Sequence, residues 1–271
     1  MTKQGFTDTI YSSVRKQLET SEFKPAKVLE VIFETIEAAK IPVKEVSSVA
    51  QKLYTRLYQD FALGDQNQAR QSWVVASGNN FENLIRTVIN TVMNREGILA
   101  IKGDKLRTKQ KASEIVEFLT LRARRRCTQM STGVWPDSDI VVLTRDSDGR
   151  FKTFALISCK TSDHSRNDSV MFWALALRET NIKYCLATMD LDGKFKNGDG
   201  HPRISGHRKK AEAYLDRVYS TNPNTTPCSQ VFKLDLNQEG GADLLLQDLR
   251  RWREAAVQDF SAEPIDETTL G

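Results

Sequence analysis

Two aspartates and a lysine flank a pair of apolar segments in the middle of the chain. Asp137 and Asp139 come directly before the apolar run 140–143, and Lys160 follows the apolar run 154–158. The connecting segment, DSDGR, consists of residues that favour tight turns, so the pattern predicts a β-hairpin. In an antiparallel hairpin the start of the first strand lies beside the end of the second. We therefore expect Asp139 and Lys160 to lie close together at one end of a sheet.

These residue types suit the hydrolysis of a phosphodiester. Side chains two residues apart on a strand point to the same face. Asp137 and Asp139 therefore share one face, and so do Ser158 and Lys160. Carboxylate oxygens are the ligands that Mg²⁺ prefers, and a metal-bound water is a nucleophile at neutral pH. A nearby ammonium can hold that water or neutralise developing negative charge. A second acid would complete the ligand set, but Ser158 stands two residues before the lysine, where that acid is expected.

The part of the chain that precedes this hairpin predicts helices. Segments 24–40 and 43–61 carry apolar residues at the three-four spacing of one helix face, and 81–94 is a further helix. Pro25 and Pro42 each stand at a helix start, where proline fits the first turn. We expect an all-helical N-terminal region.

After Gly97 the expected elements alternate between strand and helix, which predicts an α/β core. The expected strands are 98–103, 140–143, 154–158, 181–190 and 230–236. The expected helices are 113–126, 169–179, 208–218 and 242–260. The last residues, 261–271, are polar and acidic and are expected to form a flexible tail.

Composition narrows the class of protein. With 271 residues, 39% hydrophobic and 27% charged, the chain resembles ordinary soluble proteins. No apolar run approaches the ~20 residues that cross a bilayer, and the N-terminus lacks the apolar core of a signal peptide. Four widely spaced cysteines favour free thiols in a reducing cytoplasm.

The net charge of +4 is small, but the basic residues are clustered. Positive charge is dense in 107–126 and again in 207–210. Such clusters on a nearly balanced chain suit contact with phosphates, although each could equally be a solvated helix face.

The hairpin also carries a resemblance to a known family. WPDSDIVVL followed by ISCK resembles the PD-(D/E)xK nuclease superfamily, with Ser158 in place of the second acid, as in the CCGG-recognising group of type II restriction endonucleases. KTSDHSRNDSVMFW is similar to a KTS-x-R-x-R segment of several restriction enzymes, whose arginines reach guanines. SGNNFENLIR resembles a helix that supplies an additional acid, here Glu82. The resemblance covers roughly residues 77–190 and implies a restriction-endonuclease-like core, a mixed central sheet flanked by helices.

Several positions depart from these patterns. In the KTS segment His164 and Ser165 replace an arginine and an acid, and only Arg166 matches. Ala174 stands where the CCGG group has an acid, and Glu179 is the nearest acid downstream. The position of the second acid, and membership of the CCGG group, stay open.

The resemblance implies a Mg²⁺-dependent, sequence-specific endonuclease that leaves a 5′-phosphate and a 3′-hydroxyl. Asp139 and Glu82 would hold the cation, with Asp137 and the main-chain carbonyl of Cys159 as further candidate ligands. Lys160 would position the attacking water or stabilise the pentavalent phosphate. Each residue also has a structural reading: Asp137 as a turn residue, Lys160 as a strand-end lysine, and Glu82 as an acid in a first helical turn.

Two groups of residues are candidates for contact with DNA: one follows Lys160, and the other precedes the hairpin. Arg166 could donate a bidentate pair to guanine O6 and N7, or it could contact phosphate or form a surface salt bridge. His164 and Asn167 are further candidates for base contacts. Arg125 and Arg126 would contact the backbone, which adds affinity without sequence information.

The expected partner is double-stranded DNA, bound by a homodimer because a two-fold protein matches a palindromic site. No membrane and no nucleotide cofactor are expected. Residues 1–66 would serve dimerisation or DNA clamping, 67–260 would form the nuclease core, and 261–271 the tail. Three alternatives remain: a repair or junction-resolving nuclease, a DNA-binding protein without catalytic activity, and one subunit of a heterodimer.

Overall fold

The structure is a computed structural model, and it describes most of the chain. The described residues are 3–18, 25–39, 43–61, 68–69, 72, 80–120, 134–136, 138–161, 167–198, 201–236 and 238–270. They form two compact units, Met1–Val92 with Leu234–Leu244 and Met93–Lys233 with Leu245–Gly271. The division after Val92 differs from the expected boundary after residue 66, and the roles assigned to 1–66 and 67–260 stay predictions. No helix among the described residues is both long and apolar enough to span a membrane.

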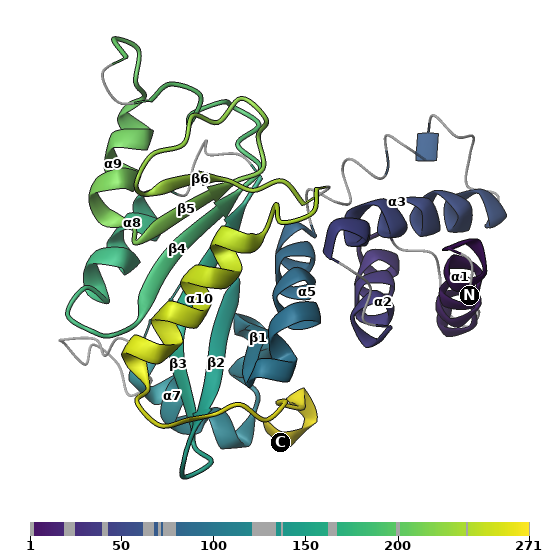
Figure 1. Ribbon diagram of the computed structural model, residues 1–271, viewed down its shortest axis with the longest axis horizontal. Coiled ribbons are helices and arrows are strands. Elements are labelled where there is room, and N and C mark those ends of the chain that lie inside the picture. The colour runs from purple at the N-terminus through teal and green to yellow at the C-terminus, as the bar shows by residue number, and fades with distance from the viewer. Residues whose placement is uncertain are drawn as a thin grey trace, which may run out of the picture. The chain divides into compact units, whose positions relative to one another are not determined.

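The N-terminal unit is helical, as the sequence predicts (Figure 1). Its helices are α1 (Lys3–Leu18), α2 (Pro25–Ala38), α3 (Val43–Asp60) and α5 (Phe81–Met93). The apolar stripe of α2, which includes Leu29, Ile32 and Ile36, is fully buried in the cluster that α1–α3 share. Burial of such stripes supplies most of the stability of helices that are too short to persist alone.

The second unit is built on a mixed sheet, which confirms the expected α/β core. Its strands are β1 (Ile98–Lys102), β2 (Ile140–Asp146), β3 (Phe151–Lys160), β4 (Lys183–Thr188), β5 (Arg217–Ser220), β6 (Val231–Lys233) and β7 (Phe260–Ser261). The order is β1-β2-β3-β4-β5-β6, and β7 pairs with β2. Strands β1, β2 and β3 are antiparallel neighbours, whereas β3 to β6 run parallel. The ends of β3–β6 therefore meet at one edge, together with the start of β2.

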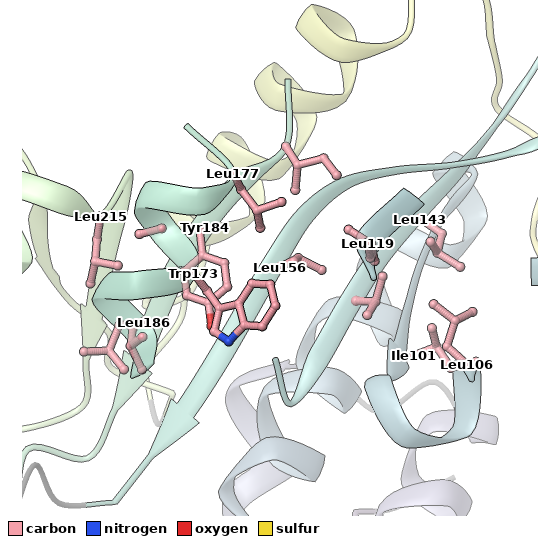
Figure 2. Close-up of a cluster of buried hydrophobic side chains, with 14 of the residues drawn as sticks. Ile101, Leu106, Leu119, Leu143, Leu156, Trp173, Leu177, Tyr184, Leu186 and Leu215 are labelled. Carbon is pink, nitrogen blue, oxygen red and sulfur yellow. The ribbon is translucent and has the colours of Figure 1, made fainter. Parts of the chain in front are cut away.

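Helices cover both faces of this sheet. One face bears α6 (Gly103–Leu106), α7 (Ser113–Leu119), α8 (Asn167–Ala176) and α9 (Gly206–Tyr214). Figure 2 shows the apolar cluster on this face, with Trp173 of α8 beside Leu156 of β3 and Tyr184 of β4. Helix α10 (Asp243–Ala256) meets the other face, where the Tyr219 hydroxyl donates to Asp248 at 2.8 Å.

Two predictions differ from the structure. The expected helix 208–218 ends at Tyr214, and Arg217–Ser220 forms strand β5 instead. Val218 and Tyr219 are fully buried there, because the strand pairs on both sides with β4 and β6. Burial between two neighbours outweighs the weak local preference of a four-residue segment.

The expected flexible tail is wrong for most of its length. Strand β7 pairs with β2, and the 3₁₀ helix η3 (Glu267–Leu270) follows it. Ile265 and Leu270 are buried in the apolar cluster that Figure 2 shows in part. The tail also passes close to Gly97, where a Cβ atom would lie 2.1 Å from the Ser261 carbonyl oxygen. Buried apolar residues anchor a segment whose polar composition alone suggested disorder.

Candidate active site

Asp139 and Lys160 lie together at the edge where β2 begins and β3 ends, as the hairpin predicts. The Lys160 Nζ atom is 3.3 Å from Asp139 Oδ2. The side chains of Lys160 and Asp139 are 11% and 24% exposed, respectively, so both are largely buried but still reach solvent. A lysine held beside a carboxylate at such an edge is the arrangement expected for phosphodiester hydrolysis.

The strand register explains this proximity. Ile140 pairs with Ile157 and Val141 with Leu156, so Asp139 comes next to Ser158. On the outer side, the Gly103 N–H donates to the Asp139 carbonyl at 3.0 Å. A Cβ on Gly103 would lie 2.5 Å from the Ser138 carbonyl oxygen, so glycine permits this close approach. Gly103 thus holds the backbone of Asp139, while β3 contacts its carboxylate.

One carboxylate oxygen of Asp139 accepts all of its hydrogen bonds. Oδ2 receives the Cys159 N–H at 2.6 Å, the Ser158 hydroxyl at 3.3 Å and the Lys160 ammonium at 3.3 Å. Among the described residues Oδ1 accepts none. Three donors fix the orientation of the carboxylate and leave Oδ1 available to a cation.

Ser158 therefore has a use that the sequence analysis did not recognise. Ser158 is fully buried and does not supply a second carboxylate to the site. Its hydroxyl instead donates a hydrogen bond to the carboxylate of Asp139. The signal was present in the sequence, since Ser158 and Lys160 share a strand face that Asp139 adjoins.

Glu82 lies in the first turn of α5, in the N-terminal unit. Its helix is tied to α2, because Arg86 Nη1 lies 3.4 Å from Glu37 Oε2 and Asn90 donates to Glu37 Oε1 at 3.0 Å. Arg86 and Asn90 are buried, so α5 is firmly held within its unit. The role of Glu82 as a metal ligand stays a prediction.

The remaining predicted residues fall into two groups. Asp137, His164, Arg166, Arg125 and Arg126 lie outside the described residues, and Asn167 is the first residue of α8. Within the described ranges no cluster of three or more His, Cys, Asp or Glu could hold a metal.

Glu179, the nearest downstream acid, does not join the site. It is exposed in the turn that follows α8 and leads to the start of β4. Because α8 connects the parallel strands β3 and β4, its end lies at the edge of the sheet opposite Asp139. Ala174 is buried in the apolar cluster.

Comparisons with known proteins agree on one class of enzyme. Residues 124–236 match the family model of the BsaWI restriction endonuclease type 2. A protein of Methanocaldococcus jannaschii that carries the provisional name type II restriction enzyme MjaVIP is 28% identical over 199 residues, which cover 69% of this chain and 84% of that protein.

Two solved structures are similar over most of their length. The AgeI restriction endonuclease–DNA complex shares 15% identity at a TM-score of 0.49, covering 91% of this chain and 92% of that one. The BsaWI–DNA complex shares 17% identity at a TM-score of 0.41, covering 94% and 93%. Both TM-scores are below 0.5.

Proposed function

The chain is a type II restriction endonuclease, and on that premise we propose that it cuts double-stranded DNA at a specific sequence with Mg²⁺. The observation that carries this proposal is the contact between Lys160 and Asp139 at one edge of a mixed sheet. The family match includes both residues.

The donor set around Asp139 fits a hard divalent cation in part. Asp139 Oδ1 is available, and the main-chain carbonyl of Cys159 is adjacent in sequence to the lysine. Mg²⁺ is commonly held by one or two carboxylates and keeps several waters, so a further acid is needed but a full protein cage is not. Asp137 and Glu82 are the acids that we propose for this role. When bound, the cation would supply an activated water and charge stabilisation at the phosphate.

Lys160 would act on the scissile phosphate. Its ammonium is held by Asp139 at 3.3 Å and its side chain is only 11% exposed, so its position is set before DNA binds. A preorganised donor of this kind stabilises charge that develops in the transition state without reorganising at that moment. Lys160 can also hold a water that lies in line with the leaving oxygen.

Sequence recognition would come from the residues that follow the lysine. We propose that Arg166, with His164 and Asn167, contacts base edges, while Arg125 and Arg126 contact phosphates. A homodimer would match a palindromic site, and cleavage would leave 5′-phosphate and 3′-hydroxyl ends.

Cleavage of plasmid and phage DNA with Mg²⁺ tests the proposal, with EDTA as the metal-free control. We expect discrete fragments with Mg²⁺ and intact DNA with EDTA. Sequencing the fragment ends gives the site and shows whether a 5′-phosphate remains.

Two other outcomes would contradict the proposal. A smear without discrete fragments would indicate a repair-type nuclease that reads DNA shape. Intact DNA under Mg²⁺ and Mn²⁺, with binding retained in gel shifts, would indicate a DNA-binding protein without catalytic activity, in keeping with Ser158 in place of an acid.

A further inference from the structure

The loop between β4 and α9 begins beside the proposed catalytic lysine. Its described part comprises residues 189–198 and 201–205, and we refer to it as the anchored loop. The Met189 N–H donates to the Lys160 carbonyl at 3.0 Å, and the Leu191 N–H to the Thr161 carbonyl at 3.3 Å. The loop therefore leaves the sheet at the edge that holds Asp139 and Lys160.

A buried aspartate holds the first turn of this loop. Asp190 has a left-handed backbone, with φ of 47°, and is fully buried. Its carboxylate accepts the N–H groups of Lys194 at 2.6 Å and Phe195 at 3.1 Å. The Phe195 ring is fully buried in the core, so the turn is fixed by both polar and apolar contacts.

A buried arginine then joins this loop to the next one. Arg208 is fully buried, and its Nη1 donates to the carbonyls of Phe195 at 2.7 Å and Thr226 at 2.8 Å. The Thr226 hydroxyl in turn donates to the Lys196 carbonyl at 2.6 Å. Burying a guanidinium is costly unless its partners are in place, so these contacts specify one loop conformation.

The main chain makes these contacts and leaves the basic side chains to solvent. Lys196 and Arg203 are exposed, although the Lys196 carbonyl accepts from Thr226 and the Arg203 carbonyl from Asn197 at 2.9 Å. Lys209, in the first turn of α9, is exposed as well. Among the described residues these three cations form no ion pair.

Three cations at the opposite edge of the same sheet lie beside acids. Lys152 lies 3.6 Å from Asp146, Arg150 lies 3.9 Å from Asp148, and both pairs flank the β2–β3 turn. Lys183, at the start of β4, lies 3.1 Å from Asp216. Lys196 and Arg203 thus differ from Arg150, Lys152 and Lys183, each of which has an acidic partner.

We propose that Lys196 and Arg203 of the anchored loop bind phosphates of duplex DNA beside the scissile bond. The proposal rests on the proposed nuclease function and extends its DNA contacts to a segment about 36 to 43 residues beyond the lysine in sequence. Residues 189–205 carry three acids, Asp190, Asp192 and Asp199, and three cations, Lys194, Lys196 and Arg203. Asp190 is fully buried and accepts backbone N–H groups of the loop, whereas Lys196 and Arg203 are exposed. A loop held by buried contacts presents its cations without an ordering cost on binding.

Salt-dependent binding of the full-length chain to duplex DNA tests this proposal. We compare wild type with the double variant Lys196→Ala/Arg203→Ala, in Ca²⁺ so that binding is separated from cleavage. The slope of log affinity against log salt falls by ~0.9 for each phosphate that the protein no longer neutralises, so we expect a decrease of about 1.8. The matched control is Arg150→Ala/Lys152→Ala, which removes the same charge from the opposite edge and should leave the slope unchanged.

Two further measurements separate DNA contact from a structural effect. The melting temperature of the loop variant should match that of wild type, and Lys196→Arg/Arg203→Lys should restore the slope. An unchanged slope in the loop variant, or an equal decrease in the control, would overturn the inference. Cleavage by wild type is measured in parallel, so a failure of the nuclease function would be recognised separately.

Discussion

Selected cations at the two edges of the central sheet have different surroundings. At the edge where β3 ends, Lys160 contacts Asp139, and Lys196 and Arg203 have no ion-pair partners among the described residues. At the other edge Arg150, Lys152 and Lys183 each meet an acid. Lys196 and Arg203 are therefore available to an anionic ligand, whereas Arg150, Lys152 and Lys183 already have acidic partners.

A second ionic network, around Asp248, lies on the face of the sheet that α10 covers. Asp248 Oδ2 accepts from the Tyr219 hydroxyl at 2.8 Å and from Arg217 Nε at 3.1 Å. Burial raises the pKa of Tyr219 well above its usual value, so the hydroxyl remains a neutral donor. These contacts join α10 to β5.

The largest effect is expected for Lys160→Ala, which removes the proposed transition-state donor. Initial cleavage rates on a plasmid should fall about 100- to 1,000-fold, while duplex binding in Ca²⁺ is retained. Lys152→Ala is the control, because it removes a lysine from the same strand at the opposite edge. If the cleavage rate of Lys160→Ala falls by less than tenfold, Lys160 is a solvated lysine at the end of a strand and has no catalytic role.

An intermediate effect is expected for Asp248→Asn, which breaks the network that joins α10 to β5. Loss of the carboxylate leaves Arg217 and Tyr219 with a weaker acceptor, so stability should fall by about 1–3 kcal/mol. Thermal unfolding measures the change, and Arg251→Ala, which removes an exposed side chain that contacts the same aspartate, serves as control. The cleavage rate per folded molecule at low temperature should be unchanged. A lower rate in Asp248→Asn would show that this network is coupled to the site of Asp139 and Lys160.

The smallest effect is expected for Ser158→Ala. The hydroxyl is one of three donors to Asp139 Oδ2, and a single hydrogen bond of this kind contributes about 1 kcal/mol. Cleavage should therefore slow by about fivefold, with the Mg²⁺ concentration for half-maximal rate shifted upward because Asp139 is less well oriented. Ser158→Thr keeps the hydroxyl and should retain more activity. If Ser158→Ala cleaves with the kinetics of wild type, Ser158 has no role in positioning Asp139.

Much of the fold could be predicted from apolar spacing. The hairpin 140–160 was predictable because two apolar runs flank a strong turn sequence, in which Gly149 adopts a φ of 79°. Strand β5 could not be predicted, because four residues directly after a helix are too few to show the alternation of apolar and polar residues that marks a strand. Its identity depends on burial between β4 and β6, which only the assembled sheet provides.

The site was predictable only where two side chains adjoin across the hairpin. Asp139 beside Lys160 follows from strand direction, but the convergence of three donors on one oxygen depends on the local register of β2 and β3. The anchored loop was visible in the sequence only as a glycine-rich segment. Its conformation comes from Asp190 and Arg208, whose burial no local pattern indicates.

The docking of residues 261–270 has a consequence for how the protein is made. The Asn94 side chain donates to the Ile265 carbonyl at 2.6 Å, and Gly97 lies against Ser261, so the start of the nuclease unit contacts its final residues. During synthesis β1 leaves the ribosome long before its last packing partners exist. Domains generally fold as units once their residues are available. Completion of this core must therefore follow translation of residue 270.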